Sequence, residues 1–200
     1  MNNWNYAEPG ILYWDRISDY NLLSTDEKFS YAGVNPCAEE PLPAGGSCLL
    51  GSLNLSEFVK DGVFATNEFI DAVHIAVTAL NDVLDEGLEL HPLDIQRQTV
   101  GDYRQIGLGV FGYADMLIKL GLRYGSKEAN SFTDELGSYL IREAIRQSAY
   151  LAKERGAYAK YDPVIMQSEF FNKHITKEFD DIREAVDSYG LRNSQLLTIA

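Results

Sequence analysis

From Thr66 onward, apolar residues recur every three or four positions, which is the spacing of one face of an α-helix. The first such stretch predicts a helix over residues 66–87, with Thr66 as its N-cap and Gly87 at its end. Its apolar face consists of Phe69, Ile70, Val73, Val77, Leu80 and Leu84. The same spacing predicts further helices over residues 93–103, 110–120, 126–156 and 178–189. The longest of them is expected to bury Phe132, Leu136, Leu140, Ala144 and Leu151.

The first 65 residues follow a different pattern, one of strands and loops. The short apolar and aromatic run ILYWDRI predicts a strand over 11–17, and a second short strand is expected over 49–53. A passage rich in proline and glycine separates them, and QLLTIA (195–200) predicts one more strand. The chain therefore reads as one helix-rich α/β segment, 1–200, with a strand and loop part (1–65) and a mainly helical part (66–200). Because these strands are too few to close a sheet, we expect part of a larger α/β fold.

Composition and charge narrow the classes of function. The net charge of −13 disfavours nucleic-acid binding by a basic face. The apolar runs are shorter than the roughly 20 residues that a spanning helix needs, so no membrane partner is expected. The first residues lack the pattern of a signal peptide, and the two cysteines are too few for a disulfide-rich secreted scaffold. A cytoplasmic protein is expected.

One glycine pattern resembles a cofactor motif. GLGVFG, with Gly107, Gly109 and Gly112, matches G-x-G-x-x-G. A dinucleotide site needs a buried strand directly before the first glycine, whereas the preceding TVGDYRQI is polar and typical of a helix. We expect these glycines to allow close packing where a helix begins. A dinucleotide-dependent dehydrogenase is kept as a disfavoured alternative.

No pattern of metal ligands stands out. An acidic cluster near the end of the predicted 66–87 helix lies opposite its apolar face and is expected to be solvated. It consists of Asp82, Asp85, Glu86 and Glu89. The three histidines, His74, His91 and His174, are scattered without the spacing of a metal site, so no metal is expected.

The passage NPCAEEPLPAGGSCLLGSLNL (35–55) carries the strongest chemical signal. In an extended loop, Asn35, Cys37 and Glu39 would share one face, since alternate side chains point the same way. Cys48 follows 11 residues after Cys37, beyond a reversal rich in proline and glycine that can fold it back. An amide, a thiol, a carboxylate and a second thiol in one pocket would suit redox chemistry on a polar substrate. The spacing does not identify that substrate.

NPCAE closely resembles the N-x-C-x-E finger-loop motif of ribonucleotide reductase large subunits, and PLPAGGSCLLGSLNL resembles the segment that supplies one cysteine of the redox pair. EPGILYWDRI (8–17), IGLGVFGYADMLIKLGLRYGS (106–126) and YGLRNSQLLTIA (189–200) resemble the same family in the same order. The resemblance covers most of the chain. It implies a partial segment of the ten-stranded α/β barrel of these enzymes.

The resemblance also implies roles in the reduction of ribonucleotides to deoxyribonucleotides. Cys37 would carry a thiyl radical that removes the 3′ hydrogen of the ribose, and Glu39 would act as base on the 3′ hydroxyl. Asn35 would orient the substrate, a ribonucleoside di- or triphosphate. Cys48 would be a reducing thiol, regenerated by a thioredoxin- or glutaredoxin-like protein. The family's other redox cysteine has no counterpart among the two cysteines present.

The radical source is a further implication of the resemblance. The Asn-Pro-Cys form and the 11-residue interval look most like adenosylcobalamin-dependent reductases, and a metal-radical small subunit is the alternative. No cofactor is expected on this segment itself. Because the phosphate-binding loop and the second redox cysteine are not matched, we expect a segment of a longer chain that is inactive alone. A folded, non-catalytic assembly module is the competing interpretation.

Overall fold

The computed structural model describes residues 1–199. Its longer helices are α3 (Thr66–Gly87), α4 (Asp94–Tyr103), α5 (Tyr113–Lys119), α6 (Lys127–Arg155) and α8 (Asp180–Tyr189). Shorter ones are α1 (Asn2–Tyr6), α2 (Trp14–Asp19) and α7 (Glu169–His174), with single 3₁₀ turns at Leu55–Phe58, Leu88–Leu90, Pro163–Gln167 and Lys177–Phe179. The strands are β1 (Gly33–Val34), β2 (Pro41–Leu42), β3 (Leu50–Asn54), β4 (Val59–Lys60), β5 (Val63–Phe64) and β6 (Gly107–Phe111).

Parallel pairing of distant segments organises the centre of the molecule. Strands β3 and β6 are parallel, with Leu50 opposite Gly107 and Asn54 opposite Phe111. The segment 195–198 runs parallel along the other edge of β6, where Leu108 and Leu197 form a bridge. This agrees with the strand predicted at the C-terminus, of which Ala200 lies outside the described residues. Three parallel segments with helical crossovers fit part of an α/β barrel.

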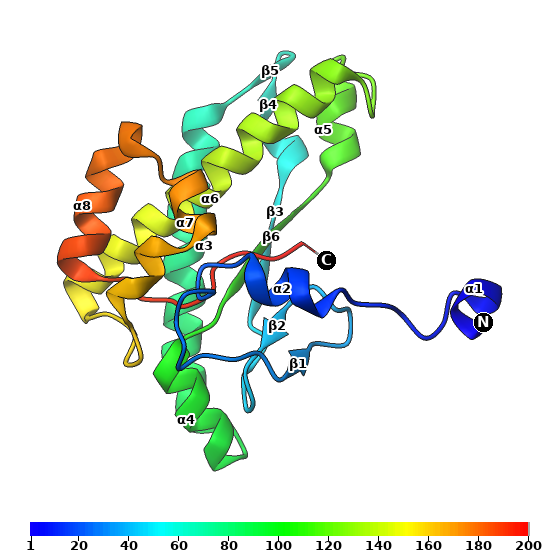
Figure 1. Ribbon diagram of the computed structural model, residues 1–200. Coiled ribbons are helices and arrows are strands. Elements are labelled where there is room, and N and C mark those ends of the chain that lie inside the picture. Colours follow the sequence, from blue (N-terminus) through cyan, green and yellow to red (C-terminus); the bar gives the residue numbers. More distant parts are fainter. Residues whose placement is uncertain (200) are drawn as a thin grey trace.

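The two long helices α3 and α6 pack against each other beside this sheet (Figure 1), and α8 packs on α6. The predicted apolar face of α3 is confirmed: Phe69, Val73, Val77, Leu80 and Leu84 are buried, while Ile70 is half-buried. In α6, all the predicted core residues are buried except Phe132, which is half-buried. Ser126 caps α6 by accepting a hydrogen bond from the backbone N of Ala129 at 3.1 Å. Thr66 is instead the first helical residue of α3 and makes no side-chain cap.

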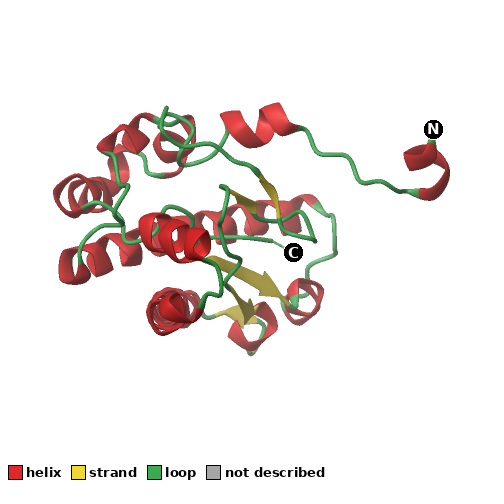
Figure 2. Cartoon of the chain, turned by 90° about the horizontal axis from the view of Figure 1, so that it is seen from below, coloured by secondary structure: helices red, strands yellow, loops and turns green. Residues whose placement is uncertain are grey.

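The strand predicted over residues 11–17 is wrong, because residues 14–19 form helix α2. Residues 11–13 are exposed, and the N-terminal arm extends away from the sheet (Figure 2). Among the described residues, no strand lies beside residues 11–17, so this apolar run has no partner for the hydrogen bonds of a sheet. Asn21 instead donates from its side chain to the carbonyls of Ile17 and Ser18, both at 2.9 Å, which satisfies the end of α2.

The helix predicted over residues 110–120 begins later than expected. Residues 107–111 form strand β6, and the helix α5 begins at Tyr113. Gly112 makes the transition with a φ of 69°, a left-handed conformation that glycine adopts without strain. The glycines 107 and 109 therefore lie inside a strand, flanked by β3 on one side and by segment 195–198 on the other.

Candidate active site

The predicted reactive loop connects β1 and β2, which pair antiparallel. It is a compact turn: the backbone N of Asn35 donates to the Glu40 carbonyl at 3.2 Å, and the N of Ala38 donates to the Asn35 carbonyl at 2.9 Å. Ala38 has a φ of 66°. The loop is therefore not extended, and the condition under which alternate side chains would share one face is not met. The turn reverses the chain and so brings the backbone of Asn35 next to that of Ala38 and Glu40.

Asn35 links this turn to the second thiol. Its side chain is buried; its Oδ1 accepts from the backbone N of Glu40 at 3.0 Å, and its Nδ2 donates to the Cys48 Sγ at 3.6 Å. Cys37 lies at the exposed side of the turn, and both cysteines are free thiols with exposed surface. The reversal between the two cysteines thus brings Cys48 to Asn35, whereas the sequence analysis placed it beside Cys37. The described contacts join Asn35 with Cys48, whereas none joins Cys37 to either residue.

A buried carboxyl group that the sequence analysis did not single out lies beside Cys48. Glu40 is only 2% exposed, and neither of its carboxylate oxygens has a hydrogen-bond partner among the described residues. Burial raises its pKa, and the negative charge of Glu39 adds to that rise. Partial desolvation, followed by the nearby Glu40 carboxyl, raises the pKa of Cys48. The Glu40 carboxyl and the Cys48 thiol are thus close to each other without the geometry of a full hydrogen bond. Because its pKa is raised, the Cys48 thiol is neutral at pH 7.

The C-terminal segment holds the far side of the turn. The Thr198 hydroxyl donates to the Glu39 carbonyl at 3.1 Å, and the Gln195 side-chain amide donates to the Pro41 carbonyl at 2.8 Å. The carboxylate of Glu39 has one buried oxygen, Oε2, that lacks a partner among the described residues. Neither Thr198 nor Gln195 was predicted as a site residue. The available signal was their polar character within the predicted strand at 195–200.

The glycines of β6 make this docking possible. A Cβ added at Gly107 would lie 2.6 Å from the Cδ2 of Leu50 and 3.0 Å from the Cγ2 of Thr198. A Cβ at Gly109 would lie 2.9 Å from the Thr198 carbonyl oxygen. The expected role of close packing is confirmed, although it operates inside a strand. A dinucleotide site needs glycines in a turn that follows a strand, and that arrangement differs from the one found here.

A buried polar network anchors the start of the same C-terminal segment. The Asn81 and Asn193 side chains exchange two hydrogen bonds, of 3.0 and 3.1 Å. Asn193 also accepts from the Ser148 hydroxyl at 3.1 Å and donates to the Arg104 carbonyl at 2.9 Å. All three polar side chains, Asn81, Asn193 and Ser148, are fully buried. The network therefore fixes segment 193–198 to α3 and α6.

The acidic cluster at the end of α3 is only partly solvated. Asp85 lies 2.6 Å from the Nη1 of Arg104 and 3.6 Å from the Nη2 of Arg192, and Asp82 lies 2.6 Å from Arg155. Two of its carboxylates thus serve ion pairs across the protein. Residues 1–199 contain no group of three or more His, Cys, Asp or Glu side chains arranged to hold a metal ion. Within the same range, no helix is long and apolar enough to cross a membrane.

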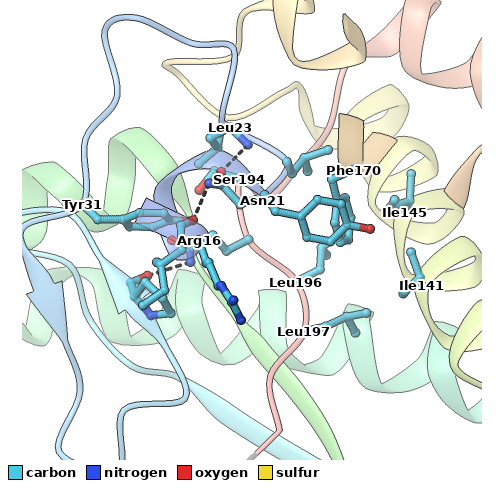
Figure 3. A pocket seen from close by; sticks show the side chains of 15 residues that line it. Arg16, Asn21, Leu23, Tyr31, Ile141, Ile145, Phe170, Ser194, Leu196 and Leu197 are labelled. Carbon is cyan, nitrogen blue, oxygen red and sulfur yellow. Dashed lines mark hydrogen bonds between the residues drawn. The ribbon is translucent and has the colours of Figure 1, made fainter. Parts of the chain in front are cut away.

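An apolar pocket of about 390 Å³ borders segment 195–198, which runs along β6 (Figure 3). Leu196 and Leu197 form one wall, and Phe170, Ile141 and Ile145 face them from the helices α6 and α7. Pro41 and Gln195, which are hydrogen-bonded to each other, also line it, so the pocket adjoins the end of the reactive turn. Its largely aliphatic and aromatic lining is suited to apolar packing.

The whole chain, residues 1–200, matches the family model described as ribonucleotide reductase, barrel domain. The chain belongs to this family. It is 33% identical to the ribonucleoside-diphosphate reductase subunit alpha of Chlamydia pneumoniae over 94% of its length. It is 36% identical to the vitamin B12-dependent ribonucleoside-diphosphate reductase of Thermoplasma acidophilum and 33% identical to that of Mycobacterium tuberculosis, each over 78% of its length. The chain spans about a fifth of the length of these relatives: 20%, 20% and 22%.

Membership explains why the described strands are few. The helix-rich chain, with three adjacent parallel segments among its described residues, is part of a larger α/β barrel, as the sequence predicted. The resemblance stated from NPCAE and the three other matching passages is likewise confirmed at the level of the family.

Proposed function

We propose that residues 1–200 form one catalytic segment of the barrel of a ribonucleotide reductase and that the turn between β1 and β2 carries its chemistry. The observation that most supports this is the contact of the buried Asn35 side chain with both Cys48 and the backbone of Glu40. It brings an amide and the proposed reducing thiol to the turn that also carries Glu39 and the exposed Cys37.

In the proposed reaction, a Cys37 thiyl radical takes a hydrogen atom from C3′ of the ribose and becomes a thiol. Glu39 accepts the 3′ hydroxyl proton, which helps the 2′ oxygen leave as water; a well-placed base contributes roughly 10²–10⁴ in rate. Cys48 and a second cysteine each supply one hydrogen, as an electron and a proton, and close a disulfide. The hydrogen atom on Cys37 then returns to C3′. The net change is one ribonucleotide and two thiols to one deoxyribonucleotide, one disulfide and water.

The second reducing cysteine must come from outside these 200 residues, because the chain has two cysteines and Cys37 carries the radical. A thioredoxin- or glutaredoxin-like protein would reopen the disulfide by thiol exchange. Thiols that must be reduced again fit a reducing compartment, and we therefore propose a cytoplasmic location. The substrate is a ribonucleoside di- or triphosphate, and the relatives named above are diphosphate reductases.

We infer that the intact enzyme uses adenosylcobalamin, in line with the two vitamin B12-dependent relatives; a metal-radical small subunit is the alternative. When bound, the cofactor supplies the radical chemistry. The residues of this chain bind and orient the ribose, hold the base and present the thiols.

The decisive test is Cys37→Ser in a full-length reductase that contains this segment. We expect deoxyribonucleotide formation to be abolished, because a serine hydroxyl does not form the corresponding radical. Ser47→Ala, in the next loop along the chain, between β2 and β3, is the control and should retain activity. Full turnover by Cys37→Ser would overturn the proposal.

The competing view of a non-catalytic module is tested with the 200-residue chain alone. We expect no product when it is supplied with nucleotide, reductant and a radical source, because one of the two reducing thiols is missing. Any reduction at all would refute the view of a non-catalytic module, and multiple turnovers by the isolated chain would in addition contradict the assigned roles of Cys37 and Cys48.

A further inference from the structure

We propose that Thr198 is a positioning residue for Glu39, the proposed catalytic base. The Thr198 hydroxyl fixes the backbone of Glu39, within the reactive turn, to the C-terminal segment. The inference rests on the proposed function for the role of Glu39. It also gives a function to the close packing that the glycines of strand β6 allow.

The contacts place Thr198 at the backbone of the base itself. Thr198 is buried, and its Oγ1 donates to the Glu39 carbonyl at 3.1 Å. Two residues further along the turn, the Pro41 carbonyl accepts from Gln195 at 2.8 Å. These two donors therefore hold the outgoing side of the turn against a segment more than 150 residues away in the sequence.

The turn's own hydrogen bonds leave this side to be held from outside. Its internal bonds connect Asn35 with Ala38 and Glu40, whereas the Glu39 carbonyl takes its hydrogen bond from Thr198. Ala38, directly before Glu39, has a φ of 66°, which is uncommon for a residue other than glycine. A small backbone rotation at this point would swing the Glu39 carboxylate. An external anchor next to Ala38 restricts that motion.

Segment 195–198 is itself rigidly held, as an anchor must be. The backbone N of Leu108 donates to the Leu196 carbonyl at 2.8 Å, and that of Thr198 donates to the Leu108 carbonyl at 3.2 Å. Gly107 and Gly109 leave the space into which Thr198 fits, since a Cβ at either would lie within 3.0 Å of it. The network around Asn193 secures the start of the segment.

The expected effect follows from the sensitivity of catalysis to position. A displacement of about 1 Å in a catalytic group can cost on the order of 10²-fold in rate. Removing one of the anchors of the turn should loosen the base without removing it. We therefore expect a loss of about tenfold in kcat, less than the 10²–10⁴ expected for loss of the base itself.

The test compares Thr198→Val, which removes the hydroxyl at nearly constant volume, with Thr198→Ser, which keeps it, in a full-length reductase containing this segment. We expect kcat to fall about tenfold in T198V with KM within about twofold of wild type, and to stay within about twofold in T198S. The matched control is Thr25→Val, because Thr25 also donates to a distant carbonyl, that of Val164, at 2.8 Å. It should leave kcat unchanged.

A double variant separates positioning from a general structural effect. If Thr198 acts through Glu39, adding T198V to Glu39→Gln should not lower the residual kcat further; an independent structural role would lower it by the same tenfold. Wild-type kcat in T198V, equal losses in T198V and T198S, or additive losses in the double variant would each overturn the inference. If T198V does not fold, Thr198→Ala serves as the hydroxyl-free variant. Retained turnover by Cys37→Ser would instead refute the proposed function, so the two failures are distinguishable.

Discussion

Asn193 connects the helical part of the protein to the segment that holds the reactive turn, and its removal should be costly. Its side chain is fully buried and makes four hydrogen bonds, two with Asn81 and one each with Ser148 and the Arg104 carbonyl. Asn193→Ala removes all four: the buried Arg104 carbonyl loses the hydrogen bond described for it, while Asn81 and Ser148 each lose part of their hydrogen bonding. Such groups lose their hydrogen bonds without regaining water.

The size of the loss can be worked from these contacts. At a net contribution of about 1 kcal/mol for each hydrogen bond, four bonds amount to about 4 kcal/mol. Water entering the space left by the side chain would lower this figure, and unpaired buried amides would raise it. We therefore expect the free energy of unfolding to fall by about 3–5 kcal/mol, a large part of the roughly 5–15 kcal/mol typical of a domain.

Urea unfolding of the 200-residue chain, followed by far-ultraviolet circular dichroism, measures this loss. Tryptophan fluorescence is unsuitable because Trp4 and Trp14 lie in the exposed N-terminal arm. The exposed Asn130 of α6 supplies the control, since Asn130→Ala should change stability by less than about 0.5 kcal/mol. Because Asn81 and Asn193 share two bonds, Asn81→Ala with Asn193→Ala should cost about 2 kcal/mol less than the sum of the single changes. A loss below about 1 kcal/mol for Asn193→Ala would refute the reasoning.

Three further changes test other parts of the structure. Burial raises the pKa of Glu40, so its stabilising contribution is full below the ordinary glutamate pKa of 4.5 and is lost as the pH rises through the raised value. Glu40→Gln should therefore gain stability relative to wild type as the pH rises, and an advantage independent of pH in urea unfolding would contradict this. Gly109→Ala should lower stability by about 1–3 kcal/mol, because the added Cβ would push on the Thr198 carbonyl. Gly137→Ala, whose added Cβ meets nothing within 4 Å, should raise stability by about 0.5–1 kcal/mol. Equal shifts of the two variants in melting temperature would contradict the packing argument. Ser126→Ala should cost about 1 kcal/mol through loss of the α6 cap, and an unchanged urea midpoint would show the cap to be without effect.

The long helices could be predicted because their signals are local. A repeat of three or four residues, a capping serine such as Ser126 and a closing glycine such as Gly156 lie within the stretch that they define. The hairpin β4–β5 had a readable signal too, which the sequence analysis did not use. Asp61 and Gly62, which connect the two strands, both adopt a positive φ, as an Asp-Gly turn favours.

The short apolar runs could not be assigned from local pattern. Residues 11–17 and 107–111 are both short stretches rich in apolar residues, yet the first leads into α2 and the second is β6. What separates them is the presence of partners: β6 lies between β3 and segment 195–198, both distant in the sequence. The conformation of the reactive turn could not be predicted for a related reason: the left-handed conformation of Ala38 cannot be inferred from its residue type. The residue types of the site were readable, but not the contacts made by Thr198, Gln195 and Glu40.

The geometry of the turn reconciles two opposing requirements of the proposed chemistry. A thiol that receives a radical and then meets a ribose must be accessible, whereas the base and the reductant must hold fixed positions. Cys37 lies exposed at the turn, while Asn35 is buried on one side of it and Glu39 is tied by its carbonyl to Thr198 on the other. The anchors attach to segments on either side of β6, with Cys48 leading into β3 and Thr198 in the C-terminal segment. It follows that the sheet sets the distance between the proposed reductant and the proposed base, and that changes within β6 should affect the proposed reaction by shifting the segments on either side of it.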